Sequence, residues 1–171
     1  MSLRATIREH LMMVWAGEPW YGSSSKAILE DITAAEAAAH PWKGVQSIWE
    51  LALHMLAWTE EVTSRLRGNR AGTPIRGDWP AVTNMSPEAW TAATTDLRAA
   101  RYALLDALEH AHEEELYMAV PVQTETGSSV PESATPTTRA TRAQTASGLA
   151  EHDVYHLGQI ALLKKALRTG A

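Results

Sequence analysis

The stretch LAEHDVYHLGQIALLKKAL, residues 149–167, decides the fold of this chain. Leu149, Ile160 and Leu163 recur at helical spacing, so they form one apolar face along the whole stretch. His152 and His156 lie on that face too, because residues four apart in sequence are one helical turn apart. The stretch is therefore predicted to be a helix whose buried face carries two imidazoles.

A second helix is predicted from SIWELALHMLAW, residues 47–58. Its start is a capping box, in which a serine is followed three residues later by Glu50. The apolar pattern continues to about Leu66, and Gly68 follows as a normal helix ending. His54 falls inside the apolar stripe, so it is expected to face the core.

Two more long helices complete the pattern. One is predicted from about Leu3 to Trp15, and the other from Pro87, which follows a capping serine, to about Glu115. One face of the latter is predicted to carry Trp90, Leu97, Arg101, Leu104 and Leu108. Shorter helical turns are expected over residues 26–32 and after Thr33, where a capping box recurs at Thr33 and Glu36.

These elements predict an all-α protein, an up-and-down four-helix bundle with antiparallel neighbours in a single domain over residues 1–171. Residues 69–85 are rich in glycine and proline and are expected to form a loop. Residues 123–148 are rich in Thr, Ser and Ala, and Val130 is their only large aliphatic residue. This segment is predicted to be a mobile loop or a weakly packed lead-in that turns helical from about Thr137.

The three histidines on the two buried faces suggest a metal site. In a bundle these faces meet, so His54 can approach His152 and His156, and imidazoles bind a metal at about 2.0–2.1 Å. Three such ligands leave at least one coordination position open. Two alternatives without a metal also remain open at this point. His152 and His156 can belong to a hydrogen-bonded polar patch, and His54 can be a core histidine whose ring nitrogens have hydrogen-bond partners.

Composition narrows the classes of function. The chain has no cysteine, so a transition-metal site must use His, Asp and Glu. The formal charge of −5 argues against a nucleic-acid partner, and no apolar run approaches the roughly 20 residues that span a membrane. Residues 1–10 do not resemble a signal peptide, so a cytoplasmic protein is expected.

Other catalytic motifs are missing. The chain contains no GxSxG elbow, P-loop, GxGxxG or HEXXH motif. Glu50, Glu61, Glu151 and Asp153 are candidates for a general base or for orienting the ligands, and each is equally well a helix cap or a surface charge. Trp58 is expected either in the core or beside the metal pocket.

Two motifs together resemble the DinB-like proteins. They are the stretch from Ser47 to Gly68 around His54, and the stretch from Glu151 to Lys165 with its two histidines; Asp78-Trp79-Pro80 and Trp90 are also similar. The resemblance implies a four-helix bundle, often dimeric, with a metal bound by His54, His152 and His156. The family usually has an aromatic and aliphatic approach to the last helix, from which residues 123–148 depart, so one wall of a substrate pocket is expected to differ.

The resemblance also sets the expected function. Some relatives use a metal and a low-molecular-weight thiol as S-transferases or maleylpyruvate isomerases, so a thiol-dependent transferase with zinc, nickel or iron is expected. The first alternative is a metal-dependent hydrolase, and the second is a non-catalytic bundle in which the metal joins two helices. The third alternative is that the three histidines bind no metal. The expected partners are a small-molecule substrate and a second copy of the chain.

Overall fold

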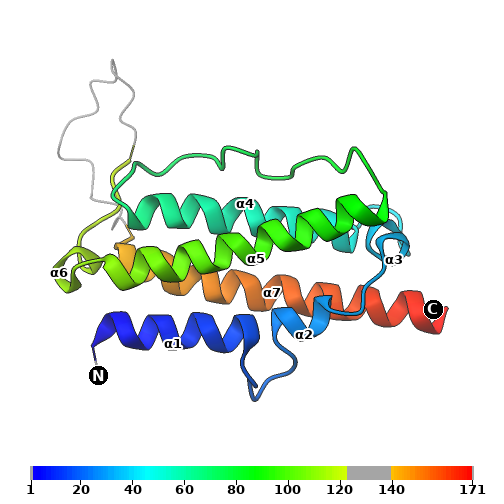
Figure 1. The fold of residues 1–171 in the computed structure, drawn as a ribbon, viewed down its shortest axis with the longest axis horizontal. Coiled ribbons are helices and arrows are strands. Elements are labelled where there is room, and N and C mark those ends of the chain that lie inside the picture. Colours follow the sequence, from blue (N-terminus) through cyan, green and yellow to red (C-terminus); the bar gives the residue numbers. More distant parts are fainter. Residues whose placement is uncertain (1, 123–139, 171) are drawn as a thin grey trace.

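The computed structural model describes residues 2–122 and 140–170. Within these residues the chain is all-helical apart from two isolated β-bridges, which confirms the predicted class. The helices are α1 (Leu3–Ala16), α2 (Ser25–Leu29), α3 (Ala34–Ala38), α4 (Ile48–Leu66), α5 (Pro87–His110), α6 (Glu113–Leu116) and α7 (Arg142–Thr169) (Figure 1). No described helix has the length and apolarity that a membrane crossing requires.

Four long helices form the bundle. Helix α4 packs against α5 and α7, and α1 packs against the same two helices from the opposite corner. Helix α2 lies just beyond the end of α1 and packs against α7, while α3 lies at one end of the bundle and α6 at the other (Figure 1). The core runs along the middle, and its largest fully buried side chains include Leu51, Met55, Leu104, Ile160 and Leu163.

Helices α4 and α5 run in the same direction, which differs from the predicted alternation of neighbours. Trp49 and Trp90 lie in the first turns of α4 and α5, and their ring centroids are 5.1 Å apart. By contrast, Arg142 at the start of α7 donates to the carbonyl of Leu66 at the end of α4, so α4 and α7 are antiparallel. The parallel pair is possible because the connection from Arg67 to Ser86 returns along the whole bundle (Figure 1).

The predicted helix starts are confirmed. Ser47 and Glu50 form a capping box at α4, and Thr33 and Glu36 form another at α3. The side chain of Ser86 accepts from the backbone N–H of Ala89 at the start of α5. Each cap satisfies backbone donors that the first helical turn leaves without a partner.

The end of α5 differs from the prediction. Helix α5 stops at His110 rather than near Glu115, because residues 111 and 112 are extended and a separate turn, α6, begins at Glu113. The carboxylate of Glu113 then accepts from the backbone N–H of Leu3, which joins the starts of α6 and α1.

The last helix begins at Arg142, within the segment predicted to be loop or helical lead-in. A capping box of Thr141 and Gln144 starts it, and the small side chains of Ala143 and Ala146 are buried in the bundle. The lead-in is therefore helical from Arg142 onwards, because alanines pack closely without large aliphatic residues. The rest of the predicted mobile segment, residues 123–139, lies outside the described residues.

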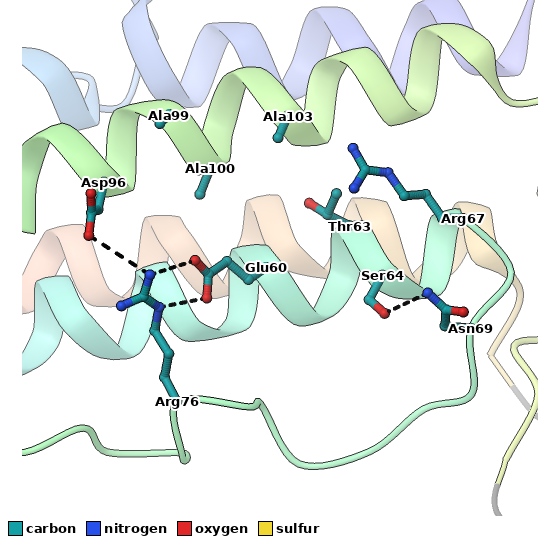
Figure 2. A pocket seen from close by; sticks show the side chains of 10 residues that line it. All are labelled: Glu60, Thr63, Ser64, Arg67, Asn69, Arg76, Asp96, Ala99, Ala100 and Ala103. Atoms are coloured by element: carbon teal, nitrogen blue, oxygen red, sulfur yellow. Dashed lines mark hydrogen bonds and ion pairs between the residues drawn. The ribbon is translucent and has the colours of Figure 1, made fainter.

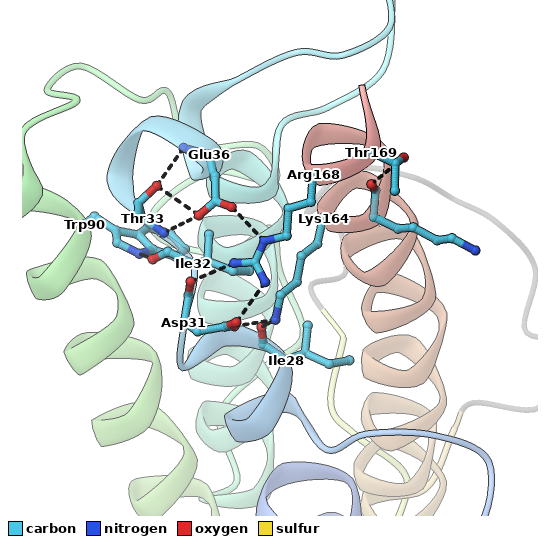
Figure 3. A network of polar contacts seen from close by, with 10 residues as sticks. Ile28, Asp31, Ile32, Thr33, Glu36, Trp90, Lys164, Arg168 and Thr169 are labelled. Carbon is cyan, nitrogen blue, oxygen red and sulfur yellow. Dashed lines mark hydrogen bonds and ion pairs between the residues drawn. The ribbon is translucent and has the colours of Figure 1, made fainter. Parts of the chain in front are cut away.

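The C-terminal turns of α7 are tied to the connection between α2 and α3. Lys164 and Arg168 both contact the carboxylate of Asp31, and Arg168 also donates to Glu36 at 2.8 Å (Figure 3). Lys164 further donates to the carbonyl of Ile28 at 2.9 Å. Basic side chains near the C-terminus of a helix complement its dipole, and here they also join the last helix to α2 and α3.

Acid is expected to loosen this end of α7. Hydrogen bonds, chiefly from Lys164 to Asp31 and from Arg168 to Glu36, lower the pKa of both carboxyls to about 2, from ordinary values of 3.8 and 4.5. Because these pKa values are depressed on folding, their stabilising effect is complete above the ordinary values and is lost as the pH falls toward 2. We expect faster amide exchange in the last two turns of α7 in that window.

The amide exchange rates are measured by hydrogen–deuterium exchange with nuclear magnetic resonance. The middle of α7 is the internal reference. In an Arg168→Met variant, exchange at this end should be faster at neutral pH and should change less on acidification. If acid accelerated amide exchange equally at the C-terminal end and in the middle of α7 in the parent protein, this account would be contradicted.

Candidate metal centre

Three histidines predicted to meet do meet between α4 and α7. His54 projects from the second turn of α4, and His152 and His156 are one turn apart on α7. The Nε2 atom of His152 lies 3.0 Å from Nε2 of His54 and 3.1 Å from Nε2 of His156. His54 and His156 are buried, and His152 is half-buried.

The spacing of the three nitrogens fits one metal ion. One nitrogen from each ring falls within a group whose members are all within 4.8 Å of one another. Ligands at about 2.0–2.1 Å in a tetrahedral arrangement lie about 3.3 Å apart. The observed separations of 3.0 and 3.1 Å are close to this value. A small shift of the rings is therefore enough for all three nitrogens to bind one ion. In the described part of the chain, no other three His, Asp or Glu side chains converge in this way.

The outer nitrogens of two of the rings have acceptors. Nδ1 of His54 donates to the backbone carbonyl of Asp78 at 2.6 Å, and Nδ1 of His156 donates to Oε1 of Gln159 at 2.6 Å. A proton fixed on Nδ1 leaves the Nε2 lone pair of a neutral ring directed toward the centre. Both rings are thus held in the tautomer that a metal ligand at Nε2 requires.

Burial favours the same neutral form. Desolvation is the largest cause that lowers the pKa of His54 and of His156 below the ordinary value of 6.5. The hydrogen bonds to Asp78 and Gln159 act in the opposite direction without cancelling it. Two of the three imidazoles therefore compete weakly for protons near neutral pH, which keeps their lone pairs available.

His152 differs from the other two. Its Nδ1 is buried, lies 3.9 Å from the carboxylate of Asp153, and has no hydrogen-bond partner among the described residues. Its side chain is 28% exposed, against 7% for His54, so solvent reaches the cluster past His152. The open side of the centre is therefore the side on which His152 lies.

A segment of the α4–α5 connection covers His54. The ring of Trp79 stacks on the imidazole of His54, with centroids 3.9 Å apart and planes inclined by 8°. Next to it, the carboxylate of Asp78 accepts from Nε1 of Trp58 at 2.7 Å. Trp58 is thus beside the centre, which was one of the two positions expected for it from the sequence. The motif Asp78-Trp79 was noted in the sequence for its family likeness only, and its contact with His54 was not predicted.

The covering segment is anchored by Arg76. Figure 2 shows its guanidinium donating to both carboxylate oxygens of Glu60 on α4, at 2.7 and 2.9 Å, with Asp96 on α5 at 3.8 Å. This fork lies at one edge of a cavity of about 390 Å³ between α4 and α5. Arg76 precedes Asp78 by two residues, so the ion pair fixes the path of the segment that orients His54.

The candidate carboxylates have other partners. Glu50 caps α4, and Glu61 accepts from Arg65 and from the backbone of Gly72. Asp153 is buried in a double contact with Arg101. Glu151 is exposed and is not part of the group that the three histidines form. Among the described residues, these four offer no free carboxylate to the triad.

Gln159 is expected to control metal affinity through His156. Removing its side-chain acceptor in Gln159→Leu frees the His156 ring to rotate or change tautomer, and such losses typically weaken metal binding about 10–100-fold. Gln159→Glu keeps an acceptor oxygen and should bind zinc at least as tightly as the parent. A zinc titration against a competing chelator measures both variants. Equal affinities for Gln159→Leu and the parent would show that the hydrogen bond does not position His156.

The fold and site together define a class: a helical bundle in which three histidines from two antiparallel helices converge on a partly open centre. The chain belongs to the DinB superfamily, whose family model matches residues 23–160. The matched region contains all three histidines and the Asp78-Trp79 segment. Neither a curated protein nor a solved structure gives a significant match to the chain.

Proposed function

We propose that this protein binds one divalent metal ion through His54, His152 and His156 and uses it in a thiol-dependent transfer reaction. The observation that carries the proposal is the convergence of three Nε2 atoms, two of them on rings whose Nδ1 already donates elsewhere. Zinc, nickel and iron all suit such a set of imidazoles. A bound ion supplies Lewis acidity, which lowers the pKa of a coordinated water or thiol toward neutrality.

The surrounding residues favour thiol transfer over hydrolysis. A hydrolase of this kind usually places a carboxylate or another base beside the reacting water. Glu61 and Asp153 are instead held by Arg65 and Arg101. A thiol with a lowered pKa can lose its proton to solvent, which reaches the centre past His152, and does not need such a base. Hydrolysis remains the second reaction of the proposal.

A non-catalytic role is supported by a different observation. His54 is on α4, and the other two histidines are on α7, so one ion bound by all three joins two antiparallel helices. Such an ion raises the melting temperature by mass action, because it binds the folded chain only. We also propose that the chain forms a dimer, as the family resemblance implies. The oligomeric state in solution tests this part of the proposal.

The test of the enzyme proposal uses protein without a histidine tag, loaded with zinc or nickel. It is incubated with a low-molecular-weight thiol and a small electrophile, and thioether formation is followed. The parent and His10→Ala, which removes an exposed histidine outside the triad, should both react. His156→Ala should not. Equal rates for the parent and His156→Ala would refute the enzyme proposal, and metal-dependent melting without turnover would support the structural role.

A further inference from the structure

A small cavity lies between α4 and α7 beside the metal centre. Its volume is about 230 Å³, and its walls include Trp58, Val62 and Arg65 of α4 and Thr145, Gly148 and His152 of α7. Thr145 and Gly148 belong to the part of α7 that was expected from the sequence to differ from the family.

The cavity opens on the accessible side of the triad. His152, the most exposed of the three histidines, is part of its wall, and its ring centroid lies 6.4 Å from that of Trp58. A molecule with a donor atom at the triad and a second group attached to it can therefore extend that group into the cavity. His54 and His156 are buried, so neither offers a comparable path.

The polar groups of Arg65 and Thr145 on the cavity wall are already engaged. The guanidinium of Arg65 donates to Glu61 at 2.9 Å and to the carbonyl of Gly72 at 3.1 Å, and it lies 5.5 Å from the centroid of the Trp58 ring. The hydroxyl of Thr145 donates to the carbonyl of Thr141 at 2.9 Å. The cavity therefore presents an aromatic face and aliphatic surface rather than a free charge, and it suits an apolar group.

The volume indicates how large that group can be. An apolar protein cavity of about 150 Å³ binds benzene. At about 230 Å³, this cavity has room for one substituted ring. Gly148 leaves part of this room open, because a Cβ atom placed on it meets nothing within 4 Å. A glycine inside a helix is destabilising relative to alanine, so its presence here is consistent with a need for space.

We propose that this cavity receives an aryl group of the molecule that reacts at the triad, and that Gly148 sets the size of the group admitted. The proposal rests on the proposed function, since it assigns the substrate class of that site: a thiol or electrophile that carries a single aromatic ring. Trp58 supplies the flat wall on which the ring stacks, and His152 marks the end of the cavity at which the donor atom sits.

The first part of the test needs no metal. Toluene is titrated into ¹⁵N-labelled protein, and the amide shifts of Val62 and Gly148 are followed. Saturable shifts are expected in the parent and in Gly148→Ala, which adds only one methyl group. In Gly148→Leu the added side chain fills the cavity, and toluene affinity should fall by at least about tenfold, or about 1.4 kcal/mol. Unmoved amides in the parent, or equal affinity in Gly148→Leu, would overturn the proposal.

The second part uses zinc-loaded protein and two thiols, phenylmethanethiol and ethanethiol. The parent should prefer phenylmethanethiol by about tenfold or more, and Gly148→Leu should lose that preference while binding ethanethiol as before. Absence of a preference in protein that binds zinc would overturn the aryl proposal and leave the metal site standing. Failure to bind zinc, nickel or iron would instead refute the proposed function, and the toluene titration would still decide whether the cavity takes an aryl group.

Discussion

Zinc affinity is expected to fall by more than about a hundredfold when His54 is replaced by alanine. The loss should exceed the roughly 10–100-fold that follows removal of a group which only orients a ligand, because a ligand itself is removed. His54 is the sole member of the triad on α4, so the variant leaves two nitrogens on one helix. The link that an ion makes between α4 and α7 is lost with it.

The experiment is a zinc titration against a chelator, with metal content of the purified protein determined in parallel. His10→Ala, which removes an exposed histidine of α1 outside the triad, is the matched control and should retain about one metal per chain. Saturating zinc should raise the melting temperature of the parent and of His10→Ala but not of His54→Ala. Full zinc affinity in His54→Ala would show that the centre does not bind metal through the triad.

The second large effect is expected at the buried ion pair between α5 and α7. Arg101 and Asp153 are 3% and 2% exposed, and two contacts of 2.6 and 2.5 Å join them. Replacing Asp153 with alanine leaves the guanidinium buried without its counter-ion. Breaking a pair of this kind typically costs about 3–5 kcal/mol, a large part of the stability of an ordinary domain. Urea unfolding followed by circular dichroism measures the loss.

A double variant separates the ion pair from the space that it fills. Arg101→Met combined with Asp153→Leu removes both charges and keeps side chains of similar length, so most of the stability lost in Asp153→Ala should return. The prediction is contradicted if the free energy of unfolding falls by less than about 1 kcal/mol in Asp153→Ala, because that is the range of an ion pair exposed to solvent. In that case the two charges do not hold α5 against α7.

The triad could be predicted from the sequence because its geometry is local on each helix. His152 and His156 are one turn apart in any α-helix, and the apolar residues around His54 indicate which way it faces. The capping boxes at Ser47 and Thr33 were predictable for the same reason, since the interactions span three residues. Gln159 follows His156 by three residues, so the helical pattern alone could have identified its hydrogen bond.

The covering segment could not be predicted in this way. The contacts of Asp78 and Trp79 with α4 depend on the path of a long connection, and that path is fixed by the ion pair of Arg76 with Glu60, sixteen residues earlier. The parallel direction of α4 and α5 follows from the same connection. Arg101 was placed on one face of its helix together with apolar residues, but its partner on α7 is 52 residues away and no local pattern links the two.

The separation of the triad along the chain has a consequence for biosynthesis. His54 and His152 are 98 residues apart, so a nascent chain that has already formed α4 still lacks two of the three nitrogens. At about 5–20 residues per second, a ribosome needs roughly 5–20 s to add the missing length. An ion that requires all three nitrogens is therefore bound only after α7 has been synthesised and has docked against α4.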